Sequence, residues 1–521
     1  MAETSGDQSA VFAFLGDPAT YGLSEPVKRI TTHGAVVFLA GRDAYKVKRA
    51  VHYPYMDFST LEKRKAACDN EIVINRENAP ELYLGVVAIT RDAAGIHLDG
   101  PGDLIEWAVH LRRFDEEATL DRVVADGGAL DPQVIATLAQ NVEAMHQRAP
   151  VREGAGATRA LRAALDETIS ELRTSVEFVA PALINRLAER LIRDFDRLEP
   201  LLLSRGNCGR VRRCHGDLHL RNIVLIDGKP VIFDALEFDD ALATTDTLYD
   251  LAFVLMDLCE HGLIGEANHL LNQYLWHCED ERGEIEGLAL LPLFLALRAL
   301  IRAKVTITQI RQTPQNAAER MQGQSAINSY LNAARAFLEP MPPRVIAIGG
   351  LSGSGKTTLA MAVASEIGAA PGAVHVRSDI ERKRMFGIDP SIRLPGKAYD
   401  ESVSTRVYQT LSDYAATALG AGQSVIVDAT FRTAREREGI ASVAETHNTP
   451  FIGIWLEAPR EVLLARVEAR RHDASDATAP VVAAQLGEEP GRIGWARLDA
   501  SQSIEKLKTA VLQLIAGHHT S

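Results

Sequence analysis

The chain has 521 residues, 46% of them hydrophobic and 24% charged, which suits roughly two to four hydrophobic cores and excludes a disordered chain. Its formal net charge of -13 argues against a protein that coats nucleic acid, because such proteins bind phosphates through an excess of Lys and Arg. The five cysteines show no CxxC spacing, which excludes a disulfide framework and a zinc knuckle.

The N-terminal part of the chain alternates between strand and helix patterns. Residues 1–16 lack a basic segment leading into a long apolar run, so we expect no secretory signal and a cytoplasmic protein. Apolar runs between Gly- and Asp-containing turns predict strands, and helical spacing predicts one helix, in this order: strands within 27–49, a helix within 59–79, and strands within 82–98 and 105–114. Together they predict a small lobe over about residues 27–114.

Helical patterns dominate the next part of the chain. Residues 115–205 are rich in Ala, Leu, Arg and Glu with few breakers, and residues 245–338 again have helical spacing. Between them, HGDLHLRNIVLIDGKPVIFDALEF at 215–238 predicts a hairpin of two apolar strands among polar residues. The most apolar window, 288–301, is shorter than a bilayer span and contains a proline and an arginine, so we expect a buried helix.

A change of pattern near Pro340 predicts a domain boundary. Closely spaced prolines end the helix, and a new apolar strand begins at Val345. Beyond it, apolar strands alternate with amphipathic helices, which is typical of a parallel sheet covered on both faces. We therefore predict one domain over residues 1–339, with a large lobe over about 115–339, and an α/β domain over 340–521.

The second predicted domain opens with a phosphate-binding motif. Residues 350–357, GLSGSGKT, match GxxxxGK[ST] between a strand and a helix. The glycines let successive backbone N–H groups point at phosphates, aided by the positive end of the helix. Lys356 is expected to reach the outer phosphates of ATP, and Thr357 to bind Mg2+. The predicted ATP-binding residues are Gly350, Gly353, Ser354, Gly355, Lys356, Thr357 and Thr358.

Two acids and a pair of arginines follow in the same domain. Asp379 and Asp428 end apolar strands, and the carboxyl ends of parallel strands line the ligand site of such a sheet. We assign Asp428 to Mg2+ and Asp379 to accepting a proton from a substrate hydroxyl; the reverse assignment, or a capping role for either, stays open. Arg466 and Arg470 share one helix face, from which they can close over transferring phosphate, unless they form a solvated basic face.

These motifs resemble those of small P-loop kinases of the zeta toxin, gluconate kinase and polynucleotide kinase type. The likeness rests on Gly350 to Thr357, on Ser378 with Asp379, and on the Arg-rich helix, and it covers about residues 344–475. No acceptor pocket of a single subfamily is matched. The resemblance therefore implies phosphoryl transfer without naming an acceptor.

A second phosphoryl-transfer motif lies in the hairpin segment. Transfer from ATP in kinases uses a carboxylate near the acceptor hydroxyl, with an amide and a second carboxylate on Mg2+. Asp217, Asn222 and Asp234 supply these groups, and the first two repeat the HxDxxxxN spacing of the kinase catalytic loop. The stretch resembles the HGDLHxxN loop of aminoglycoside phosphotransferases. By that likeness Asp217 is the base and Asn222 and Asp234 are metal ligands, while His215 holds the loop and Asp250 is a structural acid.

The small lobe supplies the rest of this second motif set. Lys46 stands two residues after a small residue, as the nucleotide-binding lysine does in the kinase pattern VAIK, and Glu71 is its expected ion-pair partner. Lys48 is the rival for that role. The chain has no GxGxxG loop, and DALE at 234–237 replaces DFG. This second departure leaves open whether Glu237 joins the metal shell or pairs with a basic residue.

The combination of the two motif sets resembles bacterial proteins that fuse an aminoglycoside phosphotransferase-like domain to an AAA-family or P-loop ATP-binding domain. It implies a multidomain chain: a two-lobed α+β protein-kinase-like domain, then an α/β P-loop domain with a parallel sheet. The implied activity is an ATP-dependent bifunctional phosphotransferase with two Mg-ATP sites and small-molecule hydroxyl acceptors; we expect neither a membrane nor nucleic acid as partner. The alternative is a P-loop kinase or zeta-like toxin restrained by a kinase-like sensor or antitoxin domain.

Overall fold

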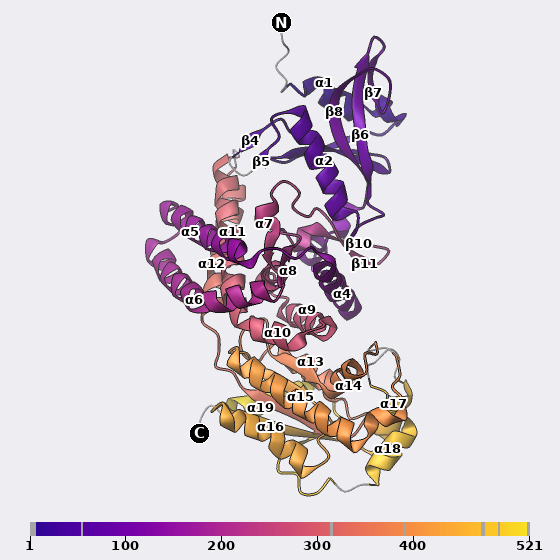
Figure 1. The fold of residues 1–521 in the computed structure, drawn as a ribbon, viewed down its shortest axis with the longest axis vertical. Helices are drawn as coiled ribbons and strands as arrows, with labels where there is room; N and C mark the ends of the chain where they lie inside the picture. Colours follow the sequence, from indigo (N-terminus) through magenta and orange to yellow (C-terminus); the bar gives the residue numbers. More distant parts are fainter. Residues whose placement is uncertain are drawn as a thin grey trace. The chain divides into compact units, whose positions relative to one another are not determined.

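The computed structural model describes residues 7–53, 56–312, 316–389, 392–469, 475–487 and 490–517. The chain forms two compact units (Figure 1). Residues 1–164 and 202–254 make the first unit, and residues 165–201 and 255–521 make the second. The predicted boundary near Pro340 lies within the second unit, between a helix that ends at Leu338 and a strand that begins at Val345.

An antiparallel sheet of six strands, in the order β1-β2-β3-β8-β6-β7, forms the N-terminal part of the first unit. The predicted strands and helix are present: β1 Lys28–Thr31, β2 Ala35–Ala40, β3 Asp43–Lys48, α2 Leu61–Asn75, β6 Tyr83–Asp92, β7 Gly95–Leu98 and β8 Asp103–Arg112. Helix α1, Ser9–Gly16, buries Val11 and Leu15 in a core with Val36 and Phe38 of β2. A short hairpin, β4 His52–Tyr53 with β5 Met56–Asp57, precedes α2.

The remainder of the first unit carries the predicted hairpin. Strand β10, Ile223–Ile226, pairs antiparallel with β11, Lys229–Ile232, and β9, Val211–Arg213, pairs with β12, Thr244–Asp246. Helices α3 Leu120–Ala125, α4 Pro132–Arg148 and α7 Asp240–Ala243 also belong to the first unit. Three further helices have residues in both units: α5 Gly154–Thr174, α6 Pro181–Asn207 and α8 Thr247–Glu260.

The second unit contains more helices and a sheet. Its first helices are α9 Ile264–His277, α10 Glu281–Gly287, α11 Leu291–Gln312 and α12 Ala317–Leu338. The most apolar window, 288–301, covers a 3-10 turn at Leu288–Leu290 and the start of α11, where every residue from Leu293 to Leu300 is buried. Across the described part of the chain, no helix combines the length and the apolar composition needed to cross a membrane.

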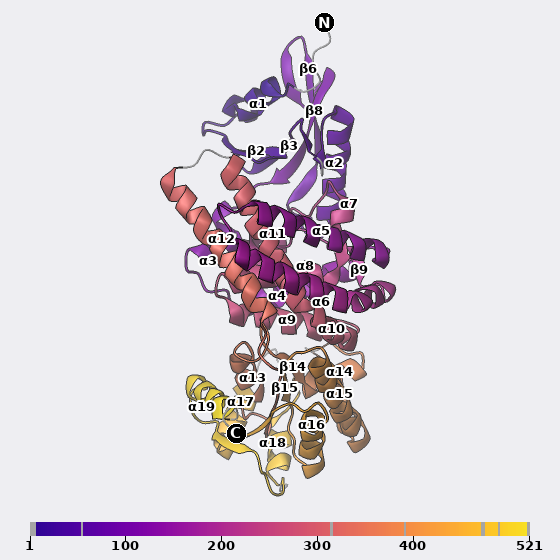
Figure 2. The same ribbon diagram turned by 90° about the vertical axis from the view of Figure 1, so that its left-hand side faces the viewer.

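A parallel sheet of five strands, in the order β14-β15-β13-β16-β17, completes the second unit. Its strands are β13 Val345–Gly350, β14 Val374–Arg377, β15 Val425–Asp428, β16 Phe451–Glu457 and β17 Ala496–Asp499. The associated helices are α13 Lys356–Ala364, α14 Ser378–Met385, α15 Glu401–Gly420, α16 Ala434–Thr446, α17 Arg460–Ala469, α18 Ala479–Leu486 and α19 Ile504–Gly517. In Figure 2, α13 and α19 lie on one side of β14 and β15, and α15 and α16 on the other.

The burial of each strand in this sheet explains which strands can be predicted from the sequence. The central strands are apolar and buried, with Ile346, Ile348 and Ile426 packed against Leu359 of α13. The fifth strand, β17, has the sequence ARLD, and its residues alternate between half-buried and exposed. It therefore lacks the apolar run from which the other four strands are predicted.

Candidate active sites

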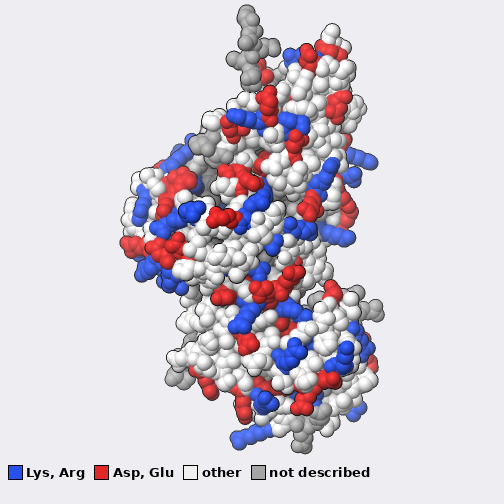
Figure 3. Space-filling model, in the orientation of Figure 1, with Lys and Arg blue, Asp and Glu red and all other residues white. Residues whose placement is uncertain are grey.

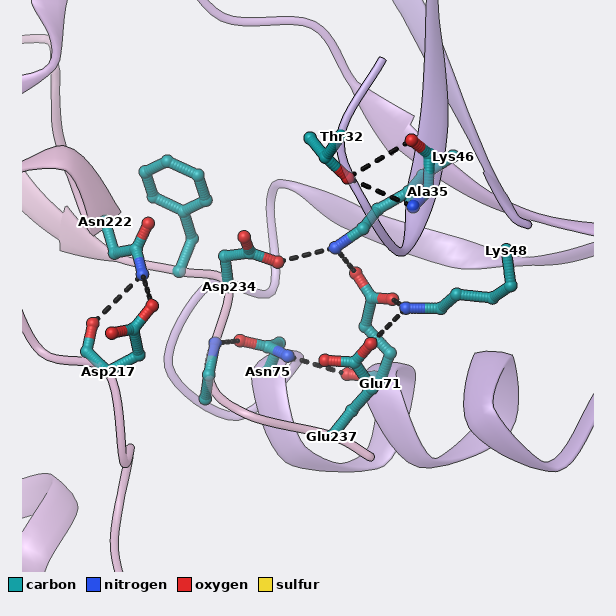
Figure 4. Close-up of polar contacts among 12 residues, drawn as sticks. Thr32, Ala35, Lys46, Lys48, Glu71, Asn75, Asp217, Asn222, Asp234 and Glu237 are labelled. Carbon is teal, nitrogen blue, oxygen red and sulfur yellow. Dashed lines mark hydrogen bonds and ion pairs between the residues drawn. The ribbon is translucent and has the colours of Figure 1, made fainter. Parts of the chain in front are cut away.

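The first site contains two lysines, one half-buried and one buried, that share one glutamate (Figure 4). Alternate residues of a strand point to the same face, so Lys46 and Lys48 of β3 both reach Glu71 of α2. The Nζ of Lys46 lies 2.9 Å from Glu71 Oε1, and the Nζ of Lys48 lies 2.5 Å from Oε2. Helix α2 is fixed at its start because the hydroxyl of Thr60 accepts a hydrogen bond from the N–H of Lys63.

Asp234 joins this cluster from the end of the hairpin. Its Oδ1 lies 2.6 Å from the Nζ of Lys46, which itself bridges Asp234 and Glu71. Burial by itself raises the pKa of Asp234, but the adjacent Lys46 charge outweighs it, so the pKa lies below the ordinary value. Asp234 has a φ of 60°, a strained conformation for a non-glycine residue, and its N–H donates to the hydroxyl of Tyr83 at 3.0 Å.

Glu237 pairs with a basic neighbour, which is one of the two possibilities that the DALE segment leaves open. Its carboxylate accepts a hydrogen bond from Lys48, whose side chain is only 1% exposed. The side chain of Asn70 on α2 donates to the carbonyl of Glu237 at 2.5 Å, and the N–H of Ala235 donates to Asn75 at 2.7 Å. The segment after Asp234 is thus fastened to α2 by two contacts, through Asn70 and Asn75, and to β3 by a third, through Lys48.

The loop from His215 to Asn222 is held by Asp250 of α8. Its carboxylate accepts hydrogen bonds from the backbone N–H groups of His215, at 3.2 Å, and Gly216, at 2.8 Å. Gly216 has a φ of 84°, a conformation that favours glycine and allows the chain to turn there. The Nε2 of His215 lies 3.0 Å from the carbonyl of Phe233, which ties the loop to the residue before Asp234. Burial lowers the pKa of His215, which favours the neutral ring.

Asp217 and Asn222 lie together on this loop. The Nδ2 of Asn222 donates to the backbone carbonyl of Asp217 at 3.0 Å and to its carboxylate at 3.3 Å. Figure 4 shows the amide oxygen of Asn222 pointing away from Asp217. The charge of Asp217 acts to raise the pKa of Asp234, although Lys46 outweighs it. The structure therefore brings together Asp217, Asn222, Asp234, Lys46 and Glu71, with donor types that suit Mg2+ and a phosphate chain.

The second site begins at the glycine-rich turn between β13 and α13. Gly353 has a φ of 86°, and a Cβ there would lie 2.6 Å from the carbonyl oxygen of Leu463. Gly350 and Gly355 also have positive φ, at 139° and 89°. The Oγ of Ser354 is buried without a hydrogen-bond partner among the described residues. A cradle that only glycine can form, with an unsatisfied hydroxyl inside it, fits a bound phosphate chain.

The predicted metal-binding pair of this site is in direct contact. The hydroxyl of Thr357 donates to Asp428 Oδ2 at 2.5 Å. Burial raises the pKa of Asp428, but His375, Lys356 and Arg377 together lower it to about 2, so the carboxylate is ionised and suited to a cation.

Two residues of β14, which sequence reasoning did not identify, surround this pair. The Nε2 of His375 lies 3.5 Å from Asp428 Oδ2, and the Nη2 of Arg377 lies 3.5 Å from the hydroxyl of Thr357. Their signal in the sequence was the alternation in VHVRSD, which places His375 and Arg377 on one face of the strand.

Asp379 and Arg466 also lie near the phosphate-binding loop. Asp379 occupies the first turn of α14, and burial together with the charge of Asp428 raises its pKa although Arg377 and Lys356 act against that shift. Arg466 of α17 donates to the carbonyl of Ala500 at 2.8 Å and lies 3.5 Å from the carbonyl of Ser354. Arg470, predicted beside Arg466, is outside the described residues.

Curated relatives share most of the length of this chain. The uncharacterized protein Rv2004c of Mycobacterium tuberculosis is 31% identical over 467 residues, covering 87% of this chain and 88% of the relative, and Mb2027c of Mycobacterium bovis matches equally. This chain belongs to their family. The "phosphotransferase enzyme family" model matches residues 84–288 of this chain, and the "AAA domain" model matches residues 345–488.

Solved kinase structures resemble separate parts of this family member. A choline/ethanolamine kinase family protein from Mesorhizobium loti is 15% identical, covers 64% of this chain and 99% of its own, and has a TM-score of 0.36. A gluconokinase from Sinorhizobium meliloti is 19% identical, covers 34% of this chain and 96% of its own, and has a TM-score of 0.26.

The two family models confirm the composite architecture predicted from the motifs. The chain combines an aminoglycoside phosphotransferase-like kinase domain with an AAA-family P-loop kinase domain, and the parallel five-stranded sheet agrees with the second of these. Kinase-family domains in both halves identify the chain as a phosphotransferase that uses a nucleotide.

Proposed function

We propose that this protein is an ATP-dependent bifunctional phosphotransferase with two Mg-ATP sites, each transferring the γ-phosphoryl group to a hydroxyl of a small molecule. The observation that supports it is the repetition of one set of groups in two unrelated folds. Each site has a lysine for phosphate, two oxygen-bearing side chains suited to Mg2+, and a further carboxylate.

In the first site, Lys46 is the residue that we assign to the nucleotide phosphates. It contacts both Glu71 and Asp234, whereas Lys48 contacts Glu71 and Glu237 and is almost fully buried. Mg-ATP, when bound, supplies the electrophilic γ-phosphorus. We assign Asn222 and Asp234 to the metal, and Asp217 to orienting the acceptor hydroxyl and accepting its proton.

In the second site, the backbone turn and Lys356 bind the phosphates, and Thr357 with Asp428 holds the metal. The close Thr357–Asp428 contact favours this assignment over the reverse one. Asp379 then accepts the proton of the acceptor hydroxyl, a role to which its raised pKa is suited because a stronger base accepts a proton more readily. Arg466, and by extension Arg470, stabilise charge on the transferring group.

The acceptors are proposed to be small molecules and not nucleic acids. On the face drawn in Figure 3, acidic side chains are interspersed with basic ones, and the net charge of the chain is -13. A continuous basic surface is what nucleic-acid binding generally requires. The use of ATP leads us to propose the cytoplasm as the site of action.

The test is ADP release and label transfer from γ-labelled ATP into a metabolite extract, using the full-length protein. Asp217→Ala and Lys356→Ala are each expected to remove a different labelled product, by about a hundredfold or more in rate, and the double variant is expected to remove both. The matched controls are Asp69→Ala and Lys508→Ala, which alter exposed ion pairs on the first and second units. Undiminished transfer by the double variant would contradict the proposal.

A further inference from the structure

Strand β14 lies at the edge of the parallel sheet, yet its outer backbone groups are bonded. An edge strand presents N–H and C=O groups that no neighbouring strand satisfies. Here the side chains of helix α9, in the same unit, take that place. Asn268 and Asn272 donate to the carbonyl of Ala373 at 3.1 and 3.2 Å, and Asn272 accepts from the N–H of His375 at 2.7 Å. Trp276 donates to the carbonyl of His375 at 2.7 Å.

The spacing of these three side chains explains how a helix can line a strand edge. Asn268, Asn272 and Trp276 are four residues apart and therefore lie on one face of α9. All three are buried, at 3%, 3% and 6% exposure, so their hydrogen bonds are shielded from water. The approach is close, since a Cβ on Gly372 would lie 2.8 Å from the amide nitrogen of Asn268.

Trp276 contacts the two side chains that surround the metal-binding pair. Its ring meets the ring of His375 edge to face, with centroids 5.3 Å apart, and the guanidinium of Arg377 lies 5.1 Å from its centroid. His375 in turn lies 3.5 Å from Asp428, and Arg377 lies 3.5 Å from the hydroxyl of Thr357. A single residue therefore lies between the indole of Trp276 and each side chain of the metal-binding pair. His375 lies between Trp276 and Asp428, and Arg377 lies between Trp276 and Thr357.

We propose that helix α9 contributes to the P-loop site. Its residues Asn272 and Trp276 are positioning residues for Asp428 and Thr357. They act through β14: Asn272 fixes the backbone of His375, and Trp276 fixes the side chains of His375 and Arg377. This inference rests on the proposed function of the P-loop site. It adds that the metal-binding geometry of that site depends on a helix more than a hundred residues before Asp428 in the sequence.

The experiment uses full-length protein and a fluorescent ATP analogue titrated at a series of Mg2+ concentrations. The wild-type binding signal that is lost in Lys356→Ala is taken as the signal of the P-loop site. The Mg2+ dependence of this signal alone is then compared between variants. Trp276→Phe keeps an aromatic ring but loses the indole N–H, and Trp276→Leu loses the ring as well. Asn272→Ala removes the contacts with the strand edge. Gln273→Ala, one residue from Asn272 on the same helix, is the matched control.

We expect the Mg2+ concentration for half-maximal binding to rise about tenfold in Asn272→Ala and Trp276→Leu, and less in Trp276→Phe, while Gln273→Ala matches the wild type. Nucleotide binding measured without Mg2+ is expected to stay unchanged, which a general loss of structure would not allow. Hydrogen exchange of the His375 amide is expected to accelerate in Asn272→Ala, because that N–H loses its acceptor.

Two failures can be told apart. If Lys356→Ala leaves nucleotide binding intact, the proposed P-loop site itself is wrong. If Lys356→Ala abolishes a binding component whose Mg2+ dependence is the same in wild type, Asn272→Ala and Trp276→Leu, the positioning role of α9 is overturned while the site stands. If the circular dichroism melt shows that a variant is unfolded, Trp276→Phe takes its place. The Mg2+ dependence of its P-loop binding is then compared with that of the wild type, and the same Mg2+ dependence overturns the positioning role.

Discussion

The two candidate sites hold their phosphate-binding lysines by different means. Lys46 is held by the carboxylates of Glu71 and Asp234, which come from a helix and from the end of a distant hairpin. Lys356 is the first residue of α13 and follows a turn of glycines with positive φ, so the backbone itself sets its position. The first site therefore depends on opposite charges that neutralise one another around the buried Glu71. The second depends on a backbone path that only glycine can follow.

The largest expected change in stability comes from removing a buried charge at the first site. In Lys48→Met, the buried carboxylate of Glu237 loses its cation, and the buried carboxylate of Glu71 keeps only Lys46. We expect the free energy of unfolding to fall by about 3–5 kcal/mol, because an uncompensated buried charge is costly. Urea unfolding followed by circular dichroism measures it.

The control for this charge test is Lys65→Met, which breaks an exposed ion pair with Asp69 on the same helix α2 as Glu71. That change is expected to cost about 0–1 kcal/mol. Equal destabilisation by the two variants would show that burial of the charges does not govern the first site.

A smaller effect is expected when the backbone path of the second site is disturbed. Gly353→Ala forces an L side chain into a φ of 86° and against the carbonyl of Leu463, 2.6 Å away. The strain, about 1–3 kcal/mol, is expected to lower ATP-analogue affinity at this site roughly ten- to hundredfold. Gly387→Ala is the control. It also puts an L side chain at a positive φ, 62°, but nothing lies within 4 Å of the added Cβ, so it has the conformational cost without the steric clash. Equal affinities for the two variants would contradict a steric requirement.

The smallest expected change in stability concerns Asp379 and its dependence on pH. Its pKa is raised in the folded protein, so its contribution to stability is complete below the ordinary Asp value of 3.8 and is lost as the pH rises through the raised pKa. At pH 7 the ionised group therefore destabilises the fold. Asp379→Asn is expected to raise the melting temperature slightly at pH 7 while abolishing phosphoryl transfer by the P-loop site.

The difference in melting temperature between Asp379→Asn and the wild type is expected to shrink as the pH approaches 3.8. Thermal unfolding at several pH values checks this prediction. A lower melting temperature for Asp379→Asn at pH 7 would show that the carboxylate is stabilised by the site, which is the behaviour expected of Asp428.

Sequence patterns were most informative where the chemistry is local. The turn from Gly350 to Thr357 and the loop from His215 to Asn222 have their functional groups within a few residues, so spacing alone identifies them. The fold class and the central strands also followed from periodicity, whereas the polar edge strand β17, helix α1 and the short strands β4, β5, β9 and β12 were not predicted. The roles assigned to the individual site residues stay predictions until the substitutions are tested.

The sequence by itself determined the identity of the two phosphate-binding motifs and the order of the elements that carry them, because apolar periodicity and glycine-dependent turns are properties of neighbouring residues. Only the tertiary structure decided that Lys46 meets Asp234, that Lys48 meets Glu237, and that the edge of β14 is bonded by α9. These contacts join residues about a hundred or more positions apart. Which of several lysines or asparagines meets a given partner depends on strand register and helix packing, which no local pattern encodes.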